Sequence, residues 1–139
     1  MRRLFTVEEV NELIPALEVV MGHLLQNAHQ IRDAVLATAS QLGKHPDEIR
    51  AADLIAVRPE LERNLEAIRE AMAQIAGMGG EVKGLDLGLV DFPSEIDGQE
   101  VLLCWQFGER EVGFYHLPDE GFAGRKPLAG SGPSVRIVH

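Results

Sequence analysis

The sequence predicts an α+β protein in which a long antiparallel helical hairpin packs with a small three-stranded antiparallel β-meander. Three observations favour this class. Apolar residues recur at steps of three and four over residues 7–42 and again over 47–76, as they do in helices that pack on a neighbour. Glycines and aromatic residues are concentrated after residue 76. This second part of the chain contains 12 of the 14 glycines and six of the seven aromatic residues. Three short apolar runs between residues 88 and 117 are separated by turn residues.

A chain of 139 residues is of the usual size for one domain, here divided into a helical part (1–76), a sheet part (77–128) and a tail (129–139). Its net charge of -9 disfavours binding to nucleic acid or to an anionic membrane surface. The one cysteine, Cys104, has no partner for an internal disulfide. Since no apolar run is long enough for a membrane span or a signal peptide, we expect a cytoplasmic protein.

The first helix is expected over residues 7–42. Thr6 and Glu9 have the spacing of a capping box, in which each side chain accepts a hydrogen bond from the other residue's backbone amide. The helix is expected to end before Gly43, because glycine commonly terminates a helix.

The second helix is expected over residues 47–76, with Pro59 as a break or a new start, because the residue before a proline avoids the helical region. The short connection before it favours an antiparallel pair. Leu13, Val20 and Leu25 widen the apolar face of the first helix beyond what one facing helix covers. The sequence therefore predicts a homodimer held by coiled-coil-like helices, unless the sheet covers these side chains.

Three strands are expected, at residues 88–93, 101–105 and 112–116. Asp97-Gly98 is the signal of a two-residue hairpin turn, which places Asp91 opposite Cys104. The register of the second hairpin stays open, because loops of three and four residues both fit. In the tail, 135–138 is a possible edge strand and 129–134 is the segment most typical of disorder.

Several short motifs follow one another in the second half, in the order Gly-Leu-Val-Asp-Phe-Pro at 88–93, Cys104-Trp105, Gly108-Glu109, Tyr115-His116 and Gly-Phe-Ala-Gly-Arg at 121–125. Together they resemble those of an uncharacterised bacterial family catalogued as domain of unknown function 2203. The resemblance covers nearly the whole chain and implies a bacterial origin and a shared fold. It implies no activity.

Six residues of the second half carry side chains that could do chemistry. They are Asp91, Cys104, Glu109, His116, Glu120 and Arg125. Thiolate, imidazole and carboxylate are common ligands of zinc and related ions, so Asp91, Cys104 and His116 are the candidate metal ligands. A divalent metal is the only cofactor that the sequence suggests, and it requires none. The same residues also fit a structural interpretation, with Asp91 paired to Arg125, Cys104 buried as a small hydrophobe and His116 bonded to a backbone carbonyl.

Two further interpretations use the same region. Cys104 and His116 could form a thiolate–imidazole pair oriented by Asp91, although a central strand presents a nucleophile poorly. The glycine loop that ends at Gly124 and Arg125 could hold an anion near Glu109, or Arg125 could instead fold back onto Asp91 or Glu109 and pin the loop to the sheet.

Three functional hypotheses follow. The first is a non-enzymatic interaction or regulatory module that binds a second copy of itself or another protein. The second is a small metal- or ligand-binding protein or enzyme whose site is built from Asp91, Cys104, Glu109, His116 and Arg125. The third is a transcriptional or cell-cycle regulator, against which the acidity of the chain argues.

Overall fold

The first helix, α1 (Val7–Leu42), has the bounds that the sequence predicts. The computed structural model describes residues 3–128. In it, the hydroxyl of Thr6 accepts from the amide of Glu9 at 3.1 Å, and the Glu9 carboxylate accepts from the amide of Thr6 at 2.8 Å. Gly43 ends the helix in the left-handed conformation, with φ of 66°. Local capping chemistry therefore determines both ends of α1.

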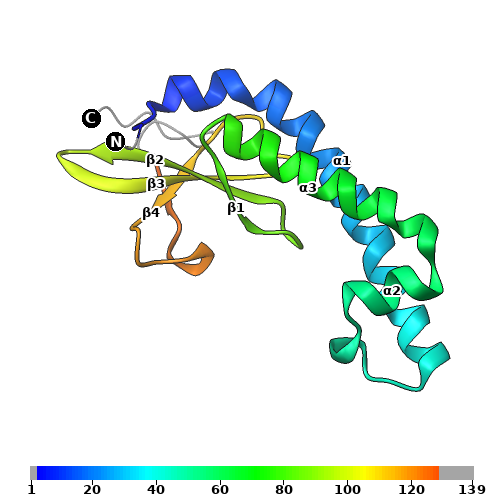
Figure 1. The fold of residues 1–139 in the computed structure, drawn as a ribbon. Helices are drawn as coiled ribbons and strands as arrows, with labels where there is room; N and C mark the ends of the chain where they lie inside the picture. The colour runs from blue at the N-terminus through cyan, green and yellow to red at the C-terminus, as the bar shows by residue number, and fades with distance from the viewer. Residues whose placement is uncertain (1–2, 129–139) are drawn as a thin grey trace.

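The return of the hairpin breaks at Pro59, as the sequence predicts, and it is interrupted a second time between Glu48 and Ala51, which was not predicted. Its pieces are η1 (Pro46–Glu48), α2 (Ala51–Val57), η2 (Pro59–Leu61) and α3 (Glu62–Gly77). The break falls at Pro59, because proline forces the preceding residue, Arg58, out of the helical region. The Arg58 guanidinium donates to the hydroxyl of Thr38 at 2.6 Å and ties the break to α1. Side chains from α3 also bond to α1, so the pair remains an antiparallel hairpin (Figure 1).

The second half forms an antiparallel sheet of five strands in chain order, where three were predicted. The strands are β1 (Glu81–Gly84), β2 (Leu89–Ile96), β3 (Gln99–Gln106), β4 (Phe114–His116) and β5 (Lys126–Pro127). The predicted strands correspond to β2, β3 and β4. Strand β4 starts later than expected, because the amide of Val112 bonds to the side chain of Asn11 instead of a neighbouring strand.

The hairpin between β2 and β3 has the predicted register. Asp97 and Gly98 both have positive φ, at 52° and 79°, as a tight hairpin turn of this kind requires. Asp91 consequently pairs with Cys104, and Val90 pairs with Trp105.

The helices cover one face of the sheet (Figure 1). Leu17 and Met21 of α1 and Ile75 of α3 pack with Phe92 and Trp105 of the sheet in a core from which water is excluded. This burial of large apolar side chains is the main stabilising contribution that the fold offers.

Leu13, Val20 and Leu25 are partly buried against this core. Part of the apolar surface from which a homodimer was predicted is therefore covered by other residues of the same chain.

The predicted edge strand and disordered segment of the tail lie outside the described residues. Within residues 3–128, no helix combines the length and apolar character that crossing a membrane requires.

Candidate functional site

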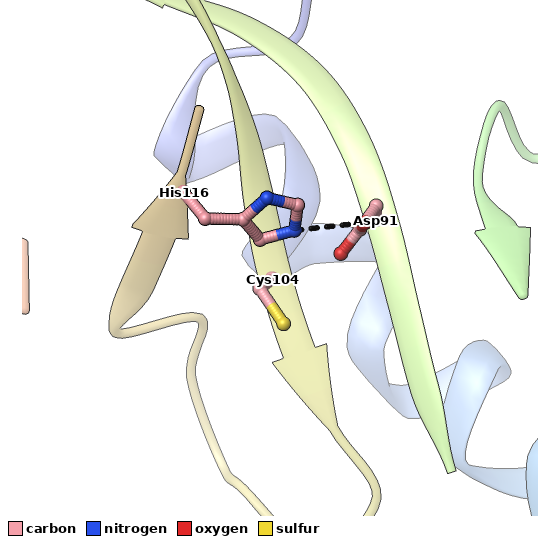
Figure 2. Close-up of side chains that lie close together, drawn as sticks. All are labelled: Asp91, Cys104 and His116. Atoms are coloured by element: carbon pink, nitrogen blue, oxygen red, sulfur yellow. Dashed lines mark hydrogen bonds and ion pairs between the residues drawn. The ribbon is translucent and has the colours of Figure 1, made fainter. Parts of the chain in front are cut away.

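The candidate metal ligands lie together on the sheet face that points away from the helices. Val90 and Trp105 pack against the helices, so the alternation of a strand turns their neighbours Asp91 and Cys104 to the opposite face. His116, at the end of β4, reaches across Cys104 to Asp91 (Figure 2). Each of these residues is buried, with Asp91 2%, Cys104 1% and His116 3% exposed. One ligand atom from each lies within 4.8 Å of the other two.

The hydrogen bonds of His116 fix the role of each ring nitrogen. Nδ1 lies 2.8 Å from the carbonyl oxygen of Leu117, to which it must donate, so Nδ1 carries a hydrogen. Nε2 lies 2.9 Å from Oδ2 of Asp91. One proton is therefore shared between Nε2 and Oδ2, and without that proton Nε2 has the free lone pair that a metal ion binds.

The second carboxylate oxygen of Asp91 is buried and unsatisfied. Among residues 3–128, Oδ1 has no hydrogen-bond partner. Buried polar atoms nearly always have one, because a desolvated oxygen without a partner is costly. The neighbouring Cys104 thiol interacts with the Asp91 carboxylate, and a cation bound at Oδ1 would satisfy this oxygen.

Cys104 is a protonated thiol in this environment. Burial raises its pKa to about 12, and the negative charge of Asp91 adds to the effect. A neutral, inaccessible thiol is a poor nucleophile, which argues against a thiolate–imidazole pair. A metal ion changes this, since coordination removes the thiol proton.

Arg125 belongs to a separate, adjoining cluster. As one of the predicted alternatives states, it folds back onto Glu109, donating through Nη2 to Oε1 at 2.8 Å and Oε2 at 3.0 Å. The same nitrogen donates to the carbonyl oxygen of Cys104 at 3.2 Å, and the guanidinium lies 4.1 Å from the centre of the Phe114 ring. Arg125 therefore connects the loop to the strand that carries Cys104.

The glycine loop is occupied by contacts within the chain. Glu109 takes up the guanidinium that an anion at Gly124 would need. Glu120 accepts from the amide of Leu117 and from Lys126, which keeps it outside the metal-ligand cluster. The loop around η3 (Phe122–Gly124) lies on the side of the sheet away from α1 (Figure 1).

Glu81 is a neighbour of the site that the sequence did not reveal. It lies on β1 directly opposite Asp91. Strand β1 was not predicted, because Glu-Val-Lys-Gly contains one strongly apolar residue and offers no alternating pattern.

Comparison with known proteins identifies one family. The family model described as an uncharacterized conserved protein (DUF2203) matches residues 3–128. No curated protein and no solved structure gives a significant match.

Proposed function

This chain belongs to the DUF2203 family of uncharacterized conserved proteins, and we propose that it binds one divalent metal ion through Asp91, Cys104 and His116. The observation that carries the proposal is the convergence of three buried ligand atoms from three strands within 4.8 Å. The unsatisfied oxygen of Asp91 supports it independently.

The charge of the ligand set suits a divalent ion. When bound, Asp91 and Cys104 each contribute one negative charge and His116 none, so the set neutralises two positive charges. The ion takes the place of two protons, one shared by Asp91 and His116 and one on the thiol. Because the exchange leaves the net buried charge unchanged, it avoids the large penalty of burying an uncompensated charge.

The donor atoms favour zinc or a similar ion over magnesium or calcium. A thiolate sulfur and an imidazole nitrogen are ligands of zinc and cobalt, whereas the hard cations prefer oxygen alone. Tetrahedral bonds of roughly 2.0–2.3 Å separate ligand atoms by roughly 3.3–3.8 Å. Asp91 and His116 would move apart slightly from their 2.9 Å hydrogen bond to reach this separation.

The carbonyl oxygen of Leu117 prepares His116 for this role. By holding the hydrogen on Nδ1, it leaves Nε2 as the coordinating atom and fixes the plane of the ring. A backbone carbonyl bonded to the outer nitrogen is a common support of metal-binding histidines.

The proposal is tested by titrating the purified chain with cobalt(II), whose bond to a thiolate gives a charge-transfer absorption band. We expect one ion per chain and a band that is absent in Cys104→Ser, a near-isosteric variant whose folding circular dichroism verifies. His116→Ala should also lose binding, while the matched control His23→Ala, at an exposed position of α1, should bind as the unaltered chain does. Absence of the band from the folded chain would contradict the proposal and favour a purely structural Asp91–His116 pair.

A further inference from the structure

A cavity of about 440 Å³ lies beside the candidate metal centre. Its walls come from β1, β2, β3, the end of α3 and the loop that follows His116, and include Ala76, Glu81, Leu102 and Pro118. Asp91 belongs both to this cavity and to the ligand cluster. The cavity therefore adjoins the ligand cluster at Asp91, whose side chain separates it from Cys104 and His116.

The volume is more than an ion or a single water needs. A water molecule takes up about 30 Å³ in the liquid, and pockets that bind small organic ligands begin at about 300 Å³. A ligand larger than water thus fits beside Asp91.

Glu81 lies at this cavity without closing it. The register places it opposite Asp91, with Cβ atoms about 5 Å apart in such pairs. Its carboxylate is turned to Lys83, at 2.6 Å, and its side chain is 71% exposed. Within residues 3–128, Asp91, Cys104 and His116 are the three metal-ligating side chains that the site brings together, and Glu81 is not among them.

We propose that the metal ion keeps a fourth coordination position open toward this cavity, where it takes water or a small monodentate anion. The inference rests on the proposed metal binding. Structural zinc sites are closed by four protein ligands, whereas catalytic sites use three and leave the fourth position to water or substrate. The set of Asp91, Cys104 and His116, with a cavity at Asp91, has the second arrangement. A water held there would be activated by the ion as a nucleophile toward a small molecule that enters the cavity.

The charges of the cavity are compatible with a small anion. Once the ion is bound, the metal and its three ligands are neutral together, so Asp91 no longer repels an anion. The other charged groups that line the cavity are Glu81 and Lys83, which balance each other.

The test uses the full chain loaded with cobalt(II), to which azide is added while the visible absorption bands are recorded. We expect azide to change the ligand-field bands saturably, without loss of the thiolate charge-transfer band. Ala76→Phe, at an exposed residue on the cavity rim, should weaken azide binding about tenfold and leave cobalt affinity unchanged. Ala73→Phe, at an exposed position of the same helix that does not line this cavity, is the matched control and should leave azide binding unaltered.

Failures of the two proposals are distinguishable. A chain that shows the charge-transfer band but no response to azide binds metal in a closed site, which overturns the open position alone. If Glu81→Gln then gained a response to azide and Glu95→Gln did not, Glu81 would be the fourth ligand. Glu95 is an exposed residue on the same strand as Asp91. It is four positions further along, so the two residues lie roughly 13 Å apart. A chain without the charge-transfer band removes both proposals.

Discussion

Replacing Arg125 with alanine should destabilise the fold by about 3 kcal/mol. The side chain is 11% exposed and its Nη2 donates to both oxygens of Glu109 and to the carbonyl of Cys104. Hydrogen bonds to charged groups contribute about 1.5–3 kcal/mol, and stacking of a cation on a ring adds about 0.5–1 kcal/mol. Glu109 is 26% exposed, so water partly replaces the guanidinium that the substitution removes. The loss of stability is therefore expected near the lower end of the roughly 3–5 kcal/mol that is typical when a buried ion pair is broken.

Urea unfolding followed by circular dichroism measures this loss, and thermal unfolding should show a fall in Tm of roughly 10 °C for a domain of this size. Lys126→Ala is the matched control, since Lys126 pairs with Glu120 on the same segment but is 46% exposed. An exposed pair contributes under about 1 kcal/mol. Equal effects of the two substitutions would refute the claim that Arg125 fastens the loop to the sheet.

Three further predictions concern the site and the assembly. Binding of one divalent ion should release about two protons, measured by calorimetry in buffers of different ionisation enthalpy, and a release near zero would contradict the ligand set. Without metal, Cys104 should resist a soluble disulfide reagent in the native protein and react after denaturation, because it is 1% exposed and its pKa is raised to about 12. Rapid labelling of the native protein would show that the thiol is accessible. Since Leu36 and Leu42 of α1 remain exposed, we also predict a homodimer, for which sedimentation should give twice the 15.3 kDa mass of one chain. A mass of one chain at micromolar concentration would exclude it.

Local chemistry made much of the fold predictable. The capping box of Thr6 and Glu9 and the stop at Gly43 determine α1 through bonds between residues close in sequence. The turn at Asp97-Gly98 likewise determines the register of β2 and β3. That register brings Asp91 beside Cys104, so the proximity of two of the three candidate ligands followed from one dipeptide.

The elements that were missed depend on contacts distant in sequence. Strand β1 has little strand propensity of its own and forms because it pairs with β2. The two residues of β5 are too few for any periodic pattern, and they are positioned by pairing with β4. Without β1, neither the cavity nor Glu81 could be predicted.

The apolar surface of α1 shows a different limit of sequence reasoning. The periodicity indicates a wide apolar face on α1, but it does not determine whether another part of the chain or a second subunit covers that face. The rest of the chain covers part of Leu13, Val20 and Leu25, through contacts between segments far apart in the sequence.

The central claim is that Asp91, Cys104 and His116 hold one divalent ion, and zinc X-ray absorption of the zinc-loaded chain tests it most directly. The account predicts a coordination shell with one sulfur at about 2.3 Å and nitrogen or oxygen ligands at about 2.0–2.2 Å. In Cys104→Ser the sulfur contribution should vanish, because Cys104 is the chain's one cysteine. A shell made of nitrogen and oxygen alone in the unaltered chain would contradict the account.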